Sequence, residues 1–132
     1  MMNLTGKTAL VTGASGGIGG AIAKALHSNG AKLVISGTRR EALDALNAEL
    51  GGAATPITCN LSDGASIESL IKESEAALGQ IDILVCNAGV TRDNLSMRMK
   101  DEEWQQVIDV NLTATFRLVR AAMKGMLKRR SG

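Results

Sequence analysis

The stretch TALVTGASGGIG, residues 8–19, decides the fold of this 132-residue chain. Residues 8–12 form a short apolar run, as expected of a buried strand, and glycines follow it at once. Over residues 17–29 the apolar side chains recur at helical spacing, and Asn29-Gly30 then ends the pattern. A strand that passes through a glycine-rich turn into a helix predicts the opening unit of an alternating α/β fold.

The same alternation continues along the chain. Further strands are predicted at residues 33–35, 55–59 and 81–86, and further helices at residues 40–50, 63–78 and 101–130. Strands that alternate with helices imply right-handed crossovers and a parallel sheet with helices on both faces. The strands are continuous apolar runs, which suits a sheet that is covered on both sides. We therefore predict one α/β domain with a Rossmann-type, doubly wound parallel sheet.

The glycine turn predicts a dinucleotide site. Its pattern is G-x-x-x-G-x-G, at Gly13, Gly17 and Gly19, in place of the stricter G-x-G-x-x-G. Such a turn lets the backbone approach a pyrophosphate, to which the helix N-terminus offers unbonded N–H groups. The predicted cofactor-binding residues of the turn are Gly13, Ala14, Ser15, Gly16, Gly17, Ile18 and Gly19. The alternative is a glycine-rich turn that binds nothing.

Two further motifs give the chain a family likeness. Residues 86–89, Cys-Asn-Ala-Gly, follow the fourth predicted strand, and Asn111 lies within the long helix. Together with TGASGGIG they resemble the short-chain dehydrogenase/reductase family. Residues 87–95 and 97–104 are most similar to the 3-oxoacyl-[acyl-carrier-protein] reductases of that family. The resemblance covers essentially the whole chain but only the first half of a family member. It therefore implies an N-terminal NADP-binding half, residues 1–132, truncated after the fourth strand and its following helix.

The end of the second strand bears on the choice between NAD and NADP. An acidic residue about 20 positions past the glycine turn would hold the ribose 2′-hydroxyl of NAD. Gly37 stands at that place, and Thr38, Arg39 and Arg40 follow it. A hydroxyl and guanidinium groups suit a 2′-phosphate, so we predict NADP(H) as the cofactor, with Thr38 and Arg39 in its site. The alternative for the two arginines is a solvated helix start.

The ends of the third and fourth strands complete the predicted cofactor site. The resemblance implies that Asn60 and Leu61 contact the adenine. It also implies that Asn87, Ala88 and Gly89 leave space for the ribose and the nicotinamide. For Asn87 the alternative is a simple turn-forming residue.

Asn111 is the one predicted catalytic residue, in a supporting role. It shares a face of the long helix with these apolar residues: Trp104, Val107, Ile108, Leu112, Phe116, Val119 and Met123. We expect it to be buried, where an asparagine must find hydrogen-bond partners. One interpretation is a core residue bonded to the backbone. The resemblance implies instead that Asn111 shapes the helix and holds water in a proton relay with a catalytic lysine.

The sequence contains no tyrosine. The resemblance implies that reduction uses a serine, a tyrosine and a lysine that lie, in the family, beyond the position of Gly132. The implied activity of the parent enzyme is NADPH-dependent reduction of 3-oxoacyl-[acyl-carrier-protein] to the 3-hydroxyacyl form in fatty-acid synthesis. The 132 residues alone are predicted to be inactive. The alternatives are a non-catalytic NADP(H)-binding half-domain, a short-chain reductase of a different ketone or alcohol, and a fragment that folds only through association.

Composition limits the partners. A net charge of +2 and only 2% aromatic residues do not fit a nucleic-acid binder. No apolar run reaches the roughly 18 residues of a membrane helix and no signal peptide is visible, so we predict a cytoplasmic protein without membrane partners. Cys59 and Cys86 are predicted to be small buried thiols, with no metal site.

The resemblance also implies protein partners. A family member forms a homo-oligomer, expected to be a tetramer built partly through the long helix. The substrate is carried by acyl carrier protein, which is acidic and which Lys128, Arg129 and Arg130 would attract. The alternative for these three cations is their favourable place at a helix C-terminus.

Overall fold

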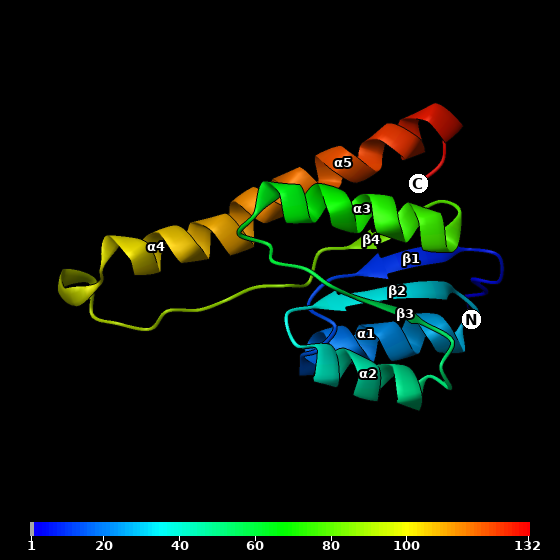
Figure 1. Ribbon diagram of the computed structural model, residues 1–132, viewed down its shortest axis with the longest axis horizontal. Coiled ribbons are helices and arrows are strands. Elements are labelled where there is room, and N and C mark those ends of the chain that lie inside the picture. Colours follow the sequence, from blue (N-terminus) through cyan, green and yellow to red (C-terminus); the bar gives the residue numbers. More distant parts are fainter. Residues whose placement is uncertain (1) are drawn as a thin grey trace.

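Four parallel strands form one sheet in the computed structural model, which describes residues 2–132 (Figure 1). The strands are β1 (Thr8–Val11), β2 (Lys32–Gly37), β3 (Thr55–Thr58) and β4 (Ile83–Val85). Their order is β3-β2-β1-β4, and Leu10 of β1 lies between Val34 of β2 and Leu84 of β4. The chain thus moves outward from β1 to β3 and then crosses to the far side of β1. This reversal creates a topological switch point between β1 and β4, where ligands bind in such sheets.

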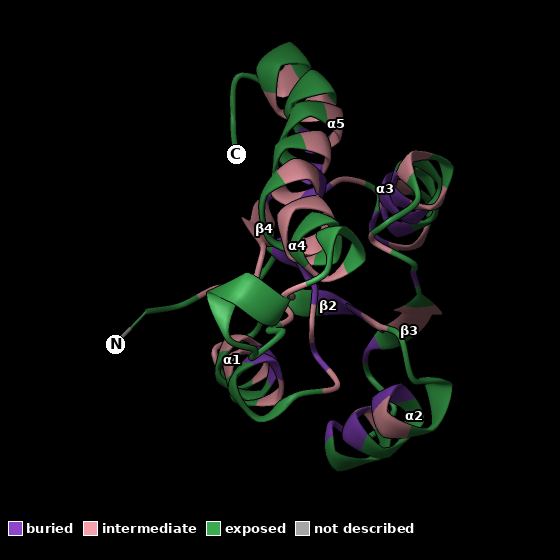
Figure 2. Cartoon of the chain, turned by 90° about the vertical axis from the view of Figure 1, so that its left-hand side faces the viewer, coloured by how far each residue is buried: buried purple, intermediate pink, exposed green. Residues whose placement is uncertain are grey.

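Helices cover both faces of the sheet, as Figure 2 shows with α1 and α2 on one side and α3 and α5 on the other. Their bounds are α1 (Gly17–Ser28), α2 (Arg40–Glu49), α3 (Gly64–Leu78) and α5 (Ala114–Arg129). Alternate strand residues supply two separate cores. Ala9 and Val11 join the core beneath α1 and α2, whereas Leu10 joins the core beneath α3 and α5. The predicted doubly wound α/β fold is confirmed.

The start of α3 follows from its capping residue. The Asp63 side chain accepts a hydrogen bond of 3.0 Å from the backbone N–H of Ala65. This bond satisfies one of the N–H groups that a helix leaves without an intrahelical partner at its first turn. Ile67, Leu70 and Ile71 then bury one side of the helix against the sheet.

The predicted long helix is divided in two. After β4 the chain passes through a 3-10 turn, η1 (Ser96–Arg98), into α4 (Asp101–Ile108), which projects beyond the sheet (Figure 1). A π-helical turn, η2 (Asp109–Thr113), then joins α4 to α5. A π turn holds one residue more than an α turn, so it rotates the faces of the two helices by about 100° relative to one another. None of the helices in the described residues is long and apolar enough to cross a membrane.

The side of α5 that packs on the sheet differs from the apolar face read from the sequence. Its buried residues are Ala114, Leu118 and Ala122. The expected apolar face is largely exposed: Trp104 at 61%, Leu112 at 63%, Phe116 at 59%, Val119 at 40% and Met123 at 43%. Two of the three buried residues are alanines, whose small side chains let α5 lie close to α3 and the sheet, and the larger residues Phe116, Val119 and Met123 stay on the outer surface.

Candidate functional site

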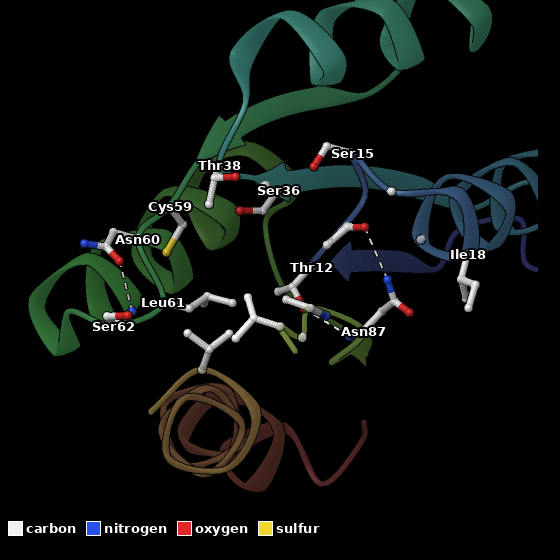
Figure 3. A pocket seen from close by; sticks show the side chains of 18 of the residues that line it. Thr12, Ser15, Ile18, Ser36, Thr38, Cys59, Asn60, Leu61, Ser62 and Asn87 are labelled. Carbon is white, nitrogen blue, oxygen red and sulfur yellow. Dashed lines mark hydrogen bonds between the residues drawn. The ribbon is translucent and has the colours of Figure 1, made fainter. Parts of the chain in front are cut away.

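A cavity of about 470 Å³ opens at the carboxyl ends of the four strands (Figure 3). Most of the residues predicted to bind a cofactor line it: Gly13, Ser15, Gly16, Gly17, Ile18, Gly19, Thr38, Asn60, Leu61, Asn87, Ala88 and Gly89. Ala14, Arg39 and Asn111 are not among its lining residues. Ala14 is buried under the turn, and the other two lie at the edges described below. One cavity therefore gathers segments that are far apart in the sequence, such as Thr12 and Ala88, which are 76 residues apart.

Two glycines of the turn are required by close packing. Gly13 has a φ of +64°, and a Cβ there would lie 2.8 Å from the backbone nitrogen of Ala88. A Cβ on Gly19 would overlap the carbonyl oxygen of Gly13 and come within 2.6 Å of the Asn87 amide nitrogen. Both distances are too short for a side chain, so these positions hold the β1–α1 turn against the segment that follows β4.

Gly17 is different, because a Cβ there would meet nothing within 4 Å. This glycine faces the cavity at the first turn of α1. In the part of the chain that the structure describes, no side chain caps α1 and no acidic residue lies in its first turn. The N–H groups and the positive end of the helix dipole are therefore directed at open space, which is the arrangement that binds phosphate.

Thr12 joins the glycine turn to the loop after β4. Its hydroxyl oxygen accepts hydrogen bonds from the backbone nitrogens of Asn87 (3.2 Å) and Ala88 (3.3 Å) and donates to the Val85 carbonyl (3.3 Å). The Asn87 amide nitrogen in turn donates to the Gly13 carbonyl oxygen at 3.2 Å (Figure 3). The Asn87 side chain thus positions the turn, close to the simple turn-forming role that the sequence left open.

The two arginines after β2 have different roles in the structure. Arg39 reaches across the rim of the cavity and donates to the Ser15 carbonyl oxygen at 3.3 Å. Arg40 instead pairs with Asp44, one helical turn further on, at 3.0 Å. No carboxylate is among the side chains that line the described cavity. The hydroxyls of Ser15 in the β1–α1 turn and of Thr38 after β2 therefore line the cavity, and the Arg39 guanidinium lies at its rim.

Asn60 is fixed by its own loop. Its side-chain oxygen accepts from the Ser62 backbone nitrogen at 3.0 Å, and its backbone nitrogen donates to the Ser66 hydroxyl at 3.0 Å. The adjacent Cys59 thiol is buried, lies 3.4 Å from the same hydroxyl and lines the cavity. Burial raises the pKa of the Cys59 thiol, although the bond to Ser66 acts the other way. Cys59 is therefore a buried thiol, as predicted.

Cys86 is only half-buried, contrary to the prediction for both cysteines, because β4 lies at the edge of the sheet. Burial also raises the pKa of this thiol.

Asn111 lies in the π turn and is exposed, which corrects the expectation that it is buried. Its side-chain oxygen accepts from the Val90 nitrogen at 2.8 Å, and its amide donates to the Val90 carbonyl oxygen at 2.9 Å. The rotation of faces at the π turn turns this side chain toward the loop after β4 and away from the core. Asn111 thus holds that loop against the π turn, because its amide oxygen and its amide nitrogen are both hydrogen-bonded to the backbone of Val90.

The sequence interpretation missed several lining residues: Thr12, Ser36, Cys59, Ser62, Val90, Gln106 and Val110. Thr12 carries a recognisable signal, since it ends the first strand directly before the glycine turn. Gln106 and Val110 carry none, because their approach to the cavity depends on how α4 and η2 are placed. The Gln106 side-chain oxygen accepts from Arg92 at 2.9 Å, which ties α4 to the loop that precedes it.

Comparisons with known proteins agree with this geometry. The pattern of the family described as short chain dehydrogenase matches residues 7–132. The chain is 50% identical over 131 residues to 3-oxoacyl-[acyl-carrier-protein] reductase FabG of Escherichia coli (strain K12), with 99% of this chain and 54% of that protein covered. It is 51% identical over 132 residues to Nodulation protein G of Rhizobium sp. (strain N33), covering 100% of this chain and 54% of the other. The chain thus spans about half the length of these relatives.

Solved structures are similar over nearly the whole chain. A short-chain type dehydrogenase/reductase from Mycobacterium marinum superposes with a TM-score of 0.92 at 35% identity, over 96% of this chain and 53% of that chain. A metagenomic short-chain oxidoreductase in complex with NADP gives a TM-score of 0.93 at 40% identity, over 98% and 60%.

Proposed function

This chain belongs to the short-chain dehydrogenase family, and from that premise we propose that it forms the dinucleotide-binding half of an NADPH-dependent 3-oxoacyl-[acyl-carrier-protein] reductase. The observation that carries the proposal is the cavity at the switch point, where the uncapped helix α1 starts with a glycine, Gly17, that leaves open space. The name of the Escherichia coli relative describes the same reaction.

The residues present fit NADP(H). The start of α1 would hold the pyrophosphate, and the loop of Asn60 and Leu61 would lie at the adenine. The side chains of Ser15, Thr38 and Arg39 would take the 2′-phosphate. The segment from Ala88 to Val90 would border the nicotinamide. A carboxylate that would repel the 2′-phosphate is missing from the described lining, which favours NADP over NAD.

In the complete enzyme, bound NADPH supplies the hydride that reduces the 3-oxo group. The part of this chain is to orient the dinucleotide and to hold the loop after β4 in place. We assign Asn111 to that positioning, through its two bonds to Val90. The water-holding role that the family resemblance implies stays a proposal, and it would have to use the backbone of the π turn.

Calorimetric titration of the chain with NADPH and with NADH tests the cofactor assignment. We expect NADPH to bind at least about tenfold more tightly, because charge-assisted hydrogen bonds to the 2′-phosphate are made only by that cofactor. Equal affinities, or no binding of either nucleotide by folded protein, would contradict the proposal.

The proposed enzyme is a homo-oligomer, and we propose a tetramer. The support is the exposed apolar face of α4 and α5, where Trp104, Leu112 and Phe116 are each about 60% exposed. We also propose that acyl carrier protein approaches the basic side of α5. Of the cations predicted for docking, Lys128 and Arg130 are exposed. Arg129 turns inward and donates to the Ile81 carbonyl oxygen at 2.8 Å.

A reductase of a different ketone is the second candidate. Its support is that Nodulation protein G, whose name gives no substrate, is as similar to this chain as the Escherichia coli reductase is, so sequence identity alone does not fix the substrate. A panel of 3-oxoacyl thioesters and simple ketones, assayed with the longer protein, separates the two. Preference for acyl carrier protein thioesters supports the first candidate, and preference for a free ketone supports the second.

A further inference from the structure

Gly37, the last residue of β2, lies directly against the side chain of Ser15 in the β1–α1 turn. A Cβ built on Gly37 would lie 2.8 Å from the Ser15 hydroxyl oxygen and 3.2 Å from the Ser15 Cβ. Gly37 is not among the described glycines with a positive φ, so its backbone would accept any L side chain. The restriction at position 37 therefore comes from the neighbouring Ser15 and not from the conformation of the strand.

The turn that carries Ser15 is held against the end of β2 by two hydrogen bonds. The Ala14 backbone nitrogen donates to the Ser36 carbonyl oxygen at 2.9 Å, and Arg39 donates to the Ser15 carbonyl oxygen at 3.3 Å. Figure 3 shows Ser15 beside this end of the strand. Since the backbone is held, the Ser15 hydroxyl is the group that can move, by rotation to another staggered position. A side chain at position 37 would therefore displace the hydroxyl and leave the turn in place.

The position of this hydroxyl bears on how the cavity distinguishes two nucleotides. Ser15, Gly37 and Thr38 all line the cavity at the end of β2. In a dinucleotide fold this is the place where a carboxylate, when one is present, binds the ribose 2′-hydroxyl of NAD. The Cβ of such a residue at position 37 and the Ser15 hydroxyl would need the same space. The two arrangements exclude one another, whatever the charge of the side chain.

We propose that Ser15 and Gly37 form a pair that determines specificity for NADP(H) on steric grounds. This inference rests on the proposed function. Because position 37 has no side chain, the Ser15 hydroxyl keeps the place from which it donates to the 2′-phosphate. The preference for NADP(H) then depends on open space at Gly37 as well as on the absence of a carboxylate there. Consequently, even the uncharged substitution Gly37→Ala should reduce the preference.

A double-mutant cycle tests whether the two residues act as a pair. Calorimetric titration gives the NADPH and NADH affinities of the wild-type chain, Gly37→Ala, Ser15→Ala and the double variant. We expect each single substitution to lower the ratio of NADPH to NADH affinity by about tenfold, while NADH affinity stays close to wild type. The double variant should match either single variant, because both changes remove the same hydroxyl contact. The control is Gly20→Ala, where a Cβ makes only ordinary contacts and the ratio should not change.

The outcomes separate this inference from the proposed function. Equal affinities of the wild-type chain for the two nucleotides would overturn both. A wild-type preference that persists in Gly37→Ala, or losses that multiply in the double variant, would overturn the steric pair alone. Thermal unfolding without nucleotide gives an independent measurement: if Gly37→Ala lowers the melting temperature, adding Ser15→Gly should restore it. Failure of this rescue would place the collision elsewhere and overturn the inference.

Discussion

Gly17 and Gly19 stand two residues apart and are glycines for opposite reasons. At Gly19 a side chain would collide with the protein itself, at the Gly13 carbonyl. At Gly17 a Cβ would meet no atom of the protein, so folding alone does not require glycine there. The open space at Gly17 adjoins the N–H groups of α1 and suits the close approach of a pyrophosphate.

Replacement of Gly17 should therefore separate binding from folding. We expect Gly17→Ala to weaken NADPH binding about tenfold, because the added methyl group occupies the phosphate path, while thermal stability stays the same or rises. The matched control is Gly20→Ala, in the same helix, where a Cβ makes only ordinary contacts. Titration and thermal unfolding of both variants give the answer. Normal binding by Gly17→Ala would show that the cradle lies elsewhere.

The two neighbouring arginines provide a second matched pair. We expect Arg39→Ala to lower NADPH affinity by about tenfold and to leave NADH affinity unchanged, because this guanidinium lies at the cavity rim beside Ser15. Arg40→Ala should change neither affinity, since Arg40 is paired with Asp44. Binding titrations with both nucleotides check this. The reverse pattern would move the 2′-phosphate site to the outer side of α2.

The sequence predicts the part of the cavity that is formed by residues at the ends of the strands. Gly13, Asn60 and Asn87 each follow a predicted strand directly, and parallel strands bring such positions to one edge. The glycine pattern predicted Gly13, and the family resemblance implied the roles of Asn60 and Asn87. Gln106 could not be assigned in this way. The position of Gln106 depends on the path of the loop after β4, which the spacing of apolar residues does not predict.

At the scale of elements, a set of hydrogen bonds joins β1 to the residues just before β4, at the ends of the strands that lie opposite the cavity. The Asp82 carboxylate accepts from the Thr8 backbone nitrogen at 2.9 Å, from the Thr8 hydroxyl at 3.1 Å and from Gln80 at 2.6 Å. Burial acts to raise the pKa of Asp82, but these hydrogen bonds outweigh it and hold the pKa below its usual value. Asp82 thereby joins the edge strand to the centre of the sheet.

These hydrogen bonds to Asp82 predict that the free energy of unfolding decreases in acid. The pKa of Asp82 is lower in the folded than in the unfolded chain, so its stabilisation is present above the unfolded pKa of about 3.9 and is lost as pH falls through the folded value. Urea unfolding at pH 7 and at pH 3 should show a larger loss of stability for wild type than for Asp82→Asn. At pH 7 the variant should be less stable by about 1–3 kcal/mol. Parallel pH profiles for the two proteins would contradict this role.

Helices and strands were predicted to within a few residues, and the long helix was the exception. Apolar periodicity indicated one continuous helix over residues 101–130, whereas the structure has α4, a π turn and α5. Periodicity does not register a single extra residue per turn, because the apolar residues on either side still recur every three or four positions. The error changed the side assigned to Asn111 and to the large apolar residues.

At the scale of the whole molecule, we expect cofactor binding and catalysis to be separable. The cavity draws its lining from the four strand ends, the start of α1, α4 and η2. The relatives that it matches are about twice as long. A protein of these 132 residues can therefore be tested for cofactor binding and for turnover as two independent properties.

We expect that protein to bind NADPH without oxidising it in the presence of acetoacetyl thioesters. Hydride transfer to the 3-oxo group places negative charge on its oxygen, and a positioned acid that protonates this oxygen contributes typically about 10²–10⁴-fold to the rate. The sequence has no tyrosine to act as that acid. The hydroxyls that line the cavity belong to serines and threonines, and the Cys59 thiol is buried beside Ser66.

Absorbance at the NADPH band, followed with protein whose mass has been confirmed, measures this turnover. The control is the same sample titrated with NADPH, so that an inactive but unfolded preparation is recognised. Oxidation that grows in proportion to protein concentration, and that disappears in Gly17→Ala, would mean that this chain carries its own proton donor. The mechanism would then have to be sought among the groups near Val90, which include Asn111, bonded to the Val90 backbone, and Gln106 in the cavity lining.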